Sequence, residues 1–244
     1  KPFSDQIDST LFDIDTTLGR THGNTMVSFE SNSVYASVGS ATGHDLVKVE
    51  KKNIDLDAGT LAIYMSNIPG CSYCEDDIWT SQFDCETYGN TQLGSVWIQD
   101  VTKSKSDCES LNGYWFNGFI GGFQFELTGI VVSGAAGGSA AAAGFNILTS
   151  PTTVLGFSLE GGVIPNSAEP VLLTTVTFTT SPDYDETGIC FGEDTGSAGG
   201  TALSDGNGAF VAAHWEPCNC SDSHPADECG VCGGDGIPDG ACDC

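Results

Sequence analysis

The sequence predicts an all-β fold, a jelly-roll β-sandwich with a disulfide-stapled insertion and a cysteine-rich C-terminal tail. Two observations support this prediction. Apolar and polar residues alternate over short segments bounded by Gly and Pro, which is typical of strands buried on one face. The 11 cysteines avoid most of these segments and fall in two clusters. Short strands with regular turns favour a sandwich, and clustered cysteines favour disulfide-stapled segments.

The first predicted region is an N-terminal extension, residues 1–53. Residues 25–29 and 34–38 are expected strands, and residues 46–50 alternate in part. The region carries five of the seven Lys and Arg residues. Two interpretations stay open. The strands add to the main domain, or they form an arm that pairs with a neighbouring subunit, because exposed strand edges are templates for another chain.

The second region, residues 54–217, is the predicted β-sandwich. In residues 122–129 the apolar side chains of Phe123, Phe125 and Leu127 alternate with polar or small ones and are expected to face the core. An Ala-rich stretch, residues 139–144, is expected to form one short helical turn. The other expected strands are residues 59–65, 154–159, 171–180, 188–191 and 208–211.

A Cys- and Trp-rich insertion, residues 69–117, interrupts this sandwich. It holds four cysteines and three of the four tryptophans, namely Cys71, Cys74, Cys85, Cys108, Trp79, Trp97 and Trp115. Two interpretations stay open. The tryptophans fill the small core of a stapled minidomain, or they form an exposed face that binds a sugar or a subunit. Four cysteines allow three pairings, among which the sequence does not choose.

The tail, residues 218–244, has few apolar residues other than cysteine and is expected to be ordered by disulfides that close short loops. The remaining cysteines are Cys190, Cys218, Cys220, Cys229, Cys232, Cys242 and Cys244. Eleven is odd, so one thiol is free, pairs between chains or has lost its partner. Zinc is the alternative to disulfides, because Cys71-x-x-Cys74 and Cys229-x-x-Cys232 have knuckle spacing.

Acidic flanks without basic residues favour disulfides over zinc, and disulfides indicate an oxidising, extracellular or cell-surface location. The chain begins with Lys1 and not with Met, and we expect it to be the mature form of a secreted protein.

The net charge of −26 at pH 7 excludes nucleic acid and anionic membrane as partners, because both require clustered Lys and Arg. No run of 18 apolar residues is present, so no membrane insertion is expected. From Ser106 to Cys244 the chain has 18 acidic residues and no Lys or Arg.

These carboxylates are either solvated in a salty medium or bound to Ca²⁺, which is the one cofactor that the sequence suggests. The candidate calcium ligands lie in Asp- and Asn-rich turns and in the tail: Asp194, Asp205, Asn207, Asp227, Asp235, Asp239 and Asp243.

Catalytic motifs are missing from the sequence. The four histidines are far apart, and the glycine after Ser158 comes one position too late for a nucleophile elbow. Ser158 is also expected to lie inside a strand. We therefore predict that the protein is not an enzyme. Asn219 begins a weak Asn-Cys-Ser glycosylation sequon.

Two stretches resemble known extracellular modules. Residues 59–65 and 120–144, with the strands that follow them up to residue 178, resemble cohesin-like β-sandwich modules of secreted microbial proteins. Residues 227–236, with the sequence Asp-Glu-Cys-Gly-Val-Cys-Gly-Gly-Asp-Gly, are similar to Asp/Cys/Gly repeats at the ends of such proteins. The resemblance covers about half of the chain. It implies a nine-strand jelly roll used in adhesion or assembly, and it carries over no dockerin-contacting residue.

Two functions follow from these features. The first is a non-catalytic structural subunit of an extracellular assembly, such as a filament, surface appendage or coat, built by self-association. The alternative is a carbohydrate- or protein-binding adhesion module of the cohesin-like type. The expected partner is accordingly a second copy, another extracellular protein or a glycan.

Overall fold

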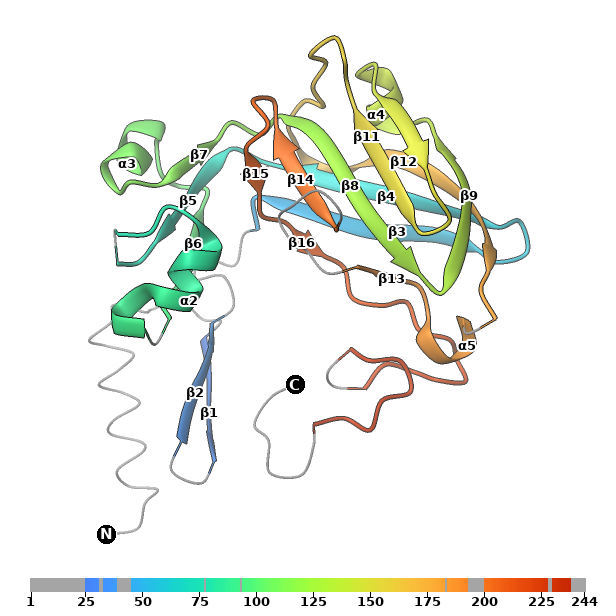
Figure 1. Cartoon of the computed structure of the whole chain (residues 1–244), viewed down its shortest axis with the longest axis horizontal. Coiled ribbons are helices and arrows are strands. Elements are labelled where there is room, and N and C mark those ends of the chain that lie inside the picture. Colours follow the sequence, from blue (N-terminus) through green and yellow to red (C-terminus); the bar gives the residue numbers. More distant parts are fainter. Residues whose placement is uncertain are drawn as a thin grey trace. The chain divides into compact units, whose positions relative to one another are not determined.

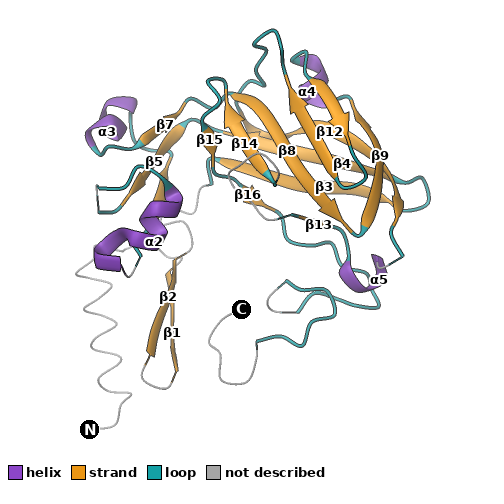
Figure 2. Cartoon of the chain, viewed as in Figure 1, coloured by secondary structure: helices purple, strands orange, loops and turns teal. Residues whose placement is uncertain are grey.

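The structure is a computed structural model that describes residues 25–30, 33–38, 45–76, 78–92, 94–182, 184–192, 200–227 and 230–237. The chain divides into two compact units, and each is described by itself. The smaller unit includes Cys71–Tyr114, and the larger unit comprises Asp45–Gly70 and Trp115–Pro238. Strands dominate the described chain, as Figure 2 shows, and the predicted all-β class is confirmed.

The larger unit is a β-sandwich whose first sheet has six strands. Five of them run in the order β10-β11-β8-β14-β15, and β13 pairs with β8. The strand pairings described in this sheet are all antiparallel. The strands are β8 (Ile120–Thr128), β10 (Asn146–Thr149), β11 (Thr153–Phe157), β13 (Cys190–Phe191), β14 (Ala202–Asp205) and β15 (Phe210–Val211).

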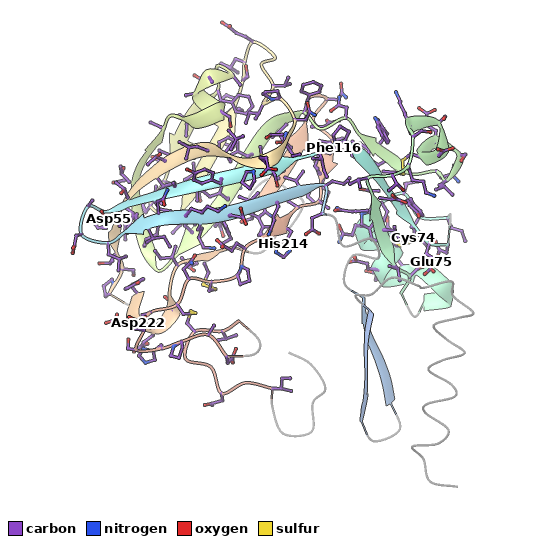
Figure 3. The ribbon with its side chains drawn as sticks, turned by 180° about the vertical axis from the view of Figure 1, so that it is seen from behind. Asp55, Cys74, Glu75, Phe116, His214 and Asp222 are labelled. Atoms are coloured by element: carbon purple, nitrogen blue, oxygen red, sulfur yellow. A yellow bond between two sulfur atoms is a disulfide. The ribbon has the colours of Figure 1, made fainter. Side chains whose placement is uncertain are left out.

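The second sheet of the sandwich has five strands in the order β16-β3-β4-β12-β9. Figure 1 shows β3 and β4 in one layer and β8, β11 and β14 in the other. The strands are β3 (Val47–Asp55), β4 (Thr60–Asn67), β9 (Ile130–Ala136), β12 (Ser167–Thr180) and β16 (His214–Trp215). Only β16 is parallel to its neighbour, β3. On β16, the Nδ1 of His214, labelled in Figure 3, lies 3.7 Å from a carboxylate oxygen of Asp45.

The sandwich core follows from strict alternation. Every second residue of β4 is buried, because successive side chains of a strand point to opposite faces. The same holds for Phe123, Phe125 and Leu127 on β8, which confirms the orientation predicted for them. The largest fully buried side chains among the described residues of the larger unit are Leu46, Val47, Val49, Leu61, Ile63, Met65, Phe116, Ile120, Phe125, Leu127, Leu173 and Ile189.

The turn from β8 into β9 requires glycine. Gly129 has φ +76°, and a Cβ at this position would collide with the carbonyl oxygen of Gly188. Replacement of Gly129 would therefore strain the backbone and push away the segment that carries Cys190.

The smaller unit contains two helices and most of a three-stranded sheet, whose third strand continues into the residues of the larger unit from Trp115 on. The order is β6-β5-β7, with β5 (Gly70–Cys74), β6 (Trp97–Asp100) and β7 (Tyr114–Phe116), and the helices are α2 (Gln82–Gln92) and α3 (Lys105–Ser110). Two disulfides, Cys71–Cys108 and Cys74–Cys85, join β5 to these helices. Cys74 stands at the end of β5 beside the exposed Glu75, as labelled in Figure 3.

A hairpin of β1 (Thr25–Glu30) and β2 (Ser33–Val38) belongs to the same unit as Cys71–Tyr114. Its strands confirm the two strands predicted at residues 25–29 and 34–38. A short helix, α4 (Gly138–Ala142), confirms the helical turn predicted in the Ala-rich stretch. The last helix is α5 (Tyr184–Thr187).

Several predictions differ from the structure. The helices α2 and α3 were not expected, because α2 has no apolar stripe and α3 is only six residues long. A capping box of Ser104 and Asp107 starts α3. Ser158 was expected in a strand, but β11 ends at Phe157 and the Ser158 hydroxyl instead accepts a hydrogen bond from the Gly162 N–H at 2.9 Å. The two sheets hold six and five strands, whereas the resemblance implied nine.

The tail folds back on the sandwich through backbone and disulfide bonds. Ile189 and Asn219 exchange two backbone hydrogen bonds of 2.9 Å, and the disulfide Cys190–Cys218 lies beside them. A second disulfide, Cys220–Cys232, closes a loop of the tail that contains the exposed Asp222, labelled in Figure 3. None of the helices in the described part of the chain is long and apolar enough to cross a membrane.

Candidate binding face

The outward side of the six-stranded sheet carries two rows of neighbouring residues. Strand register aligns Leu148, Leu155, Gln124 and Ala202 in the first row. The second row consists of Asn146, Phe157, Gly122, Ser204 and Phe210. Because side chains opposite one another in a sheet share a face, both rows point away from the core that Phe123 and Leu203 fill. We call this surface the outer face.

A groove of about 350 Å³ crosses the outer face. Phe157 on β11 and Phe210 on β15 form its walls, and they lie three strand spacings, about 14 Å, apart. Gly122 and Ser204 form the floor between them. Phe210 is 38% exposed and Leu148, beside the groove, is 54% exposed. The groove is therefore an apolar surface with aromatic walls, open to solvent.

Two glycines shape this groove. Gly122 has no side chain to fill the floor, and a Cβ there would meet the hydroxyl of Ser204 at 2.9 Å and the carbonyl oxygen of Gly156 at an ordinary contact distance of 3.6 Å. Gly156, on the inward side of β11, leaves the space that the ring of Phe123 occupies. The first glycine keeps the groove open from outside, and the second lets the core pack directly beneath it.

The outer face carries no basic side chain. Every strand of the six-stranded sheet lies after Ser106, where the sequence has no Lys or Arg, and Glu126 lies on the outward side of β8 next to Gln124. Basic residues of the larger unit are confined to β3, where Lys48 and Lys52 flank Glu50 at 3.4 and 2.8 Å. Hydrogen bonding to Lys52 lowers the pKa of Glu50. The two outer sides of the sandwich thus differ in charge.

Aromatic rings and one lysine fill the interior behind the outer face. The ring of Phe191 lies 5.0 Å from that of Trp215 and 5.8 Å from that of Phe125, edge to face in both pairs. The Nζ of Lys51 lies 4.1 Å from the centre of the Phe191 ring. Its side chain is fully buried and donates to the carbonyl oxygens of Glu216 and Pro217 at 3.1 and 3.0 Å.

Burial lowers the pKa of Lys51 to about 8, and the nearby Glu216 carboxylate opposes this shift in part. The Lys51 ammonium group is stabilised mainly by the two carbonyl oxygens and the Phe191 ring. Its ion pair with Glu216 contributes less, because the nearest Glu216 carboxylate oxygen is 3.9 Å away. Lys51 therefore ties β3 to the segment that leads into the tail.

Of the candidate calcium ligands among the described residues, Asp205 and Asn207 lie in one turn, where the Asn207 side-chain amide donates to the Asp205 carboxylate at 3.3 Å. The carboxylate of Asp205 accepts backbone N–H groups of Asn207 and Ala209, at 2.8 and 2.9 Å. Asp227 in the same way accepts from Val231 and Gly236, at 2.8 and 2.9 Å. Asp205 and Asp227 thus act as loop caps, and Asp235 is exposed. Calcium binding stays a prediction. Asp194, Asp239 and Asp243 lie outside the described residues.

The candidate tryptophans are half-buried and lie in different surroundings. Trp79 stacks at a tilt on Tyr88 with ring centres 5.8 Å apart, and the indole nitrogen of Trp97 is buried without an acceptor. Both belong to the smaller unit, whereas Trp115 in β7 belongs to the larger one. A role of these rings in sugar binding stays a prediction.

Eight of the eleven cysteines form four disulfides, and the disulfide-rich character is confirmed. Cys71 and Cys74, proposed above as a zinc knuckle alternative, belong to two different disulfides. Cys229, Cys242 and Cys244 lie outside the described residues. Asn219, the sequon residue, is half-buried, and its side-chain oxygen is buried without a partner.

Sequence reasoning missed the groove and Lys51. The groove depends on the strand register that places Phe157 and Phe210 in the same row of the sheet, with two strands between them. Alternation within a single segment does not reveal which strands pair or in which register. Val47, Val49 and Lys51 do occupy alternate positions of β3, but a lysine is ordinarily taken to break an apolar pattern.

Comparisons with known proteins add one structure. No protein-family model matches the chain, and no curated protein matches it. A chain of the crystal structure of a type I cohesin–dockerin complex from Clostridium thermocellum is similar at 14% identity and a TM-score of 0.35, covering 71% of this chain and 90% of that chain. A likeness at this level carries no conclusion about what the present protein binds.

Proposed function

We propose that this protein is a non-catalytic, extracellular binding module, and that the groove of the outer face docks a polypeptide presenting an apolar side chain flanked by Lys or Arg. The observation that carries the proposal is the open groove with Phe157 and Phe210 as walls and Gly122 as floor. Partly exposed apolar surface of this kind marks interaction sites, and aromatic residues dominate the binding free energy at interfaces.

The shape of the groove favours a polypeptide over a small molecule. It crosses four strands, is open to solvent and is bordered by the exposed Leu148, so one or two side chains of a larger partner fit it. None of the residues that line it is charged. The anchor of the partner is therefore apolar, and charges contribute from the rim.

The charge distribution favours a basic partner. The net charge is −26, and the segment that supplies every strand of the outer face has no Lys or Arg. A partner with Lys or Arg around its anchor would be steered to this surface, whereas an acidic one would be repelled.

The same charge disfavours a second copy of this chain as the occupant, because two molecules of −26 repel each other. Self-association into a filament or coat therefore becomes the alternative outcome of the test. Glycan binding through Trp79, Trp97 or Trp115 is a further alternative. The four disulfides support an extracellular location, since they persist in oxidising compartments.

The test is selection from a displayed library of random peptides against the intact protein. We expect enriched peptides to contain a Leu, Ile, Met or Phe with Lys or Arg within a few residues. The affinity of these peptides for the protein should fall at least about tenfold in Phe210→Ala, which removes a wall of the groove, and in Gly122→Val, which fills its floor.

Gly134→Val is the matched control for Gly122→Val. Gly134 is also a half-buried strand glycine, but it lies on the other sheet. The nearest atom to its Cβ would again be a hydroxyl oxygen, that of Thr177 at 3.0 Å. Enriched peptides that bind Gly122→Val as tightly as the wild type would contradict the proposal. Concentration-dependent self-association that Gly122→Val abolishes would assign the groove to a second copy and overturn the proposed partner.

A further inference from the structure

Two disulfides meet at the base of the tail, within the larger unit. The sulfur atoms of Cys190, Cys218 and Cys232 all lie within 4.8 Å of one another, and Cys232 is bonded to Cys220. Among the described residues this is the one group of three or more potential metal-ligating side chains that the fold brings so close. We call these four residues the sulfur cluster.

We propose that the sulfur cluster is an exchangeable site, at which an incoming thiol is attached covalently to the protein by thiol–disulfide exchange. The proposal does not depend on the groove or on its partner. It rests on the mutual distance of the sulfurs, on their exposure and on the cysteine count.

The local fold keeps the two disulfides adjacent. The paired backbones of Ile189 and Asn219 hold Cys190 next to the Cys218–Cys220 segment. Gly188 allows the second disulfide to approach, because a Cβ there would lie 2.7 Å from the Cys232 sulfur and 2.9 Å from Cys220 Cα. A thiolate released at Cys232 is therefore already beside the Cys190–Cys218 bond.

Exposure distinguishes this cluster from the other two disulfides. All four of its cysteines are half-buried. The cysteines of the smaller unit are buried to 1% exposure or less: Cys71, Cys74, Cys85 and Cys108. Exposed disulfides are the labile ones, because an attacking thiolate must reach a sulfur atom.

The exchange balances in electrons and protons. An incoming thiolate attacks the Cys220 sulfur, forms a mixed disulfide and releases the Cys232 thiolate. That thiolate attacks the Cys218 sulfur, forms Cys218–Cys232 and releases the Cys190 thiolate. Each step forms one S–S bond and breaks one. The proton lost by the incoming thiol is taken up by the last thiolate, so no oxidant is needed.

The chain itself supplies thiols of the required class. With 11 cysteines, at least one in each chain of this sequence has no partner within the chain. The incoming thiol is the unpaired cysteine of a second copy of this chain or a small thiol such as glutathione, and the arms of the experiment separate these sources.

The first arm compares two single variants of the full chain. Cys220→Ser leaves the Cys232 thiol beside Cys190–Cys218, and we expect peptide mapping of the acid-quenched, alkylated protein to find Cys190–Cys232 or Cys218–Cys232 besides the native pair. Cys85→Ser is the matched control. It leaves the Cys74 thiol, and Cys71–Cys108 should stay intact. Native pairing alone in Cys220→Ser would contradict the proposal.

The second arm uses the wild-type protein and does not depend on a variant that folds. Limiting glutathione is added at pH 8 with a chelator, and the products are trapped at low pH. We expect glutathione on the sulfur cluster, and alkylation of its cysteines at least about tenfold faster than that of the smaller unit. Equal alkylation rates for the cysteines of the sulfur cluster and those of the smaller unit would overturn the proposal. Glutathione attack on the smaller unit first would overturn it as well.

A third arm identifies a protein source of the thiol. The untreated wild-type protein is concentrated and examined by non-reducing mass measurement. A disulfide-linked dimer that maps to the sulfur cluster indicates a cysteine of a second chain as the incoming thiol. A dimer linked through the cysteines of the smaller unit would contradict the assignment.

Discussion

Lys51 shows how a single residue links the sandwich to its tail. Its fully buried ammonium contacts the ring of Phe191 and two carbonyl oxygens of the Glu216–Pro217 segment. The folded protein must desolvate this charge, which lowers the pKa to about 8 from the ordinary value of 10.5. Such a charge costs stability at neutral pH, and its hydrogen bonds offset part of the cost.

The pKa of Lys51 predicts how stability depends on pH. Below pH 8 the lysine is protonated in both states, and the folded state bears the desolvation cost. Between about pH 8 and 10.5 the unfolded chain binds more protons than the folded one, so the contribution of this residue to stability rises with pH. The whole effect amounts to about 3 kcal/mol.

Chemical denaturation of the wild type and of Lys51→Met from pH 7 to 10.5 checks this prediction. We expect the difference in unfolding free energy, wild type minus variant, to grow more positive with pH. A difference that stays constant over this range would show that Lys51 does not titrate with the lowered pKa.

Asp205 is a second residue whose role the structure specifies. It is 5% exposed, and one of its carboxylate oxygens accepts two backbone N–H groups in the turn between β14 and β15. We expect Asp205→Ala to lower the unfolding free energy by about 1–3 kcal/mol, because two backbone hydrogen bonds to a buried carboxylate are lost. Asp235→Ala, at an exposed position, should change it by less than about 0.5 kcal/mol.

Thermal melting of these variants with Ca²⁺ and with a chelator separates the two roles of Asp205. A loop cap predicts the same loss of stability in both buffers. A loss confined to the Ca²⁺ buffer would show instead that Asp205 binds the ion.

At the scale of elements, disulfides stabilise the smaller unit more than its helices do. Helix α2 has no apolar stripe, and both disulfides of this unit are fully buried. Cys71–Cys108 spans 37 positions. Removing a disulfide that closes a loop of this length lowers the unfolding free energy by about 4 kcal/mol, because the unfolded chain gains entropy. We therefore expect the double variant Cys71→Ser with Cys108→Ser to unfold this unit while the sandwich persists.

Hydrogen exchange of the double variant gives the readout. Protection should be lost in β5, β6 and α3 and kept in β4, β8 and β12. The double variant Cys190→Ser with Cys218→Ser is the control, since it removes a half-buried disulfide from the other unit. Retained protection in β5 would show that packing and not cross-linking stabilises the smaller unit.

The elements also show what could be predicted from the sequence. Strands with strict alternation, such as β4 and β8, were predicted within a few residues, because one buried face imposes a period of two. Strand β15 lies within the strand predicted at residues 208–211, whereas β14 and β16, with four and two residues, were not predicted because such short strands depend on their neighbours. The groove could not be predicted either, because its walls come from β11 and β15, which are distant in sequence and are brought together only by strand pairing.

For the whole molecule, the net charge of −26 predicts how salt affects association. Binding of a basic peptide to the outer face should weaken as salt rises from 50 to 500 mM, because the attraction is screened. Self-association should respond in the opposite way, since salt screens the repulsion between copies. Titrations at several salt concentrations check this, and peptide binding that strengthens with salt would contradict the proposed partner.

The most direct test of the central claim is calorimetric titration of one library-selected basic peptide into the wild type, Gly122→Val and Gly134→Val. If the groove on the outer face is the binding site, Gly122→Val loses at least about tenfold in affinity and Gly134→Val stays within about twofold of the wild type. Equal affinities for all three proteins would contradict the assignment of the groove as the binding site.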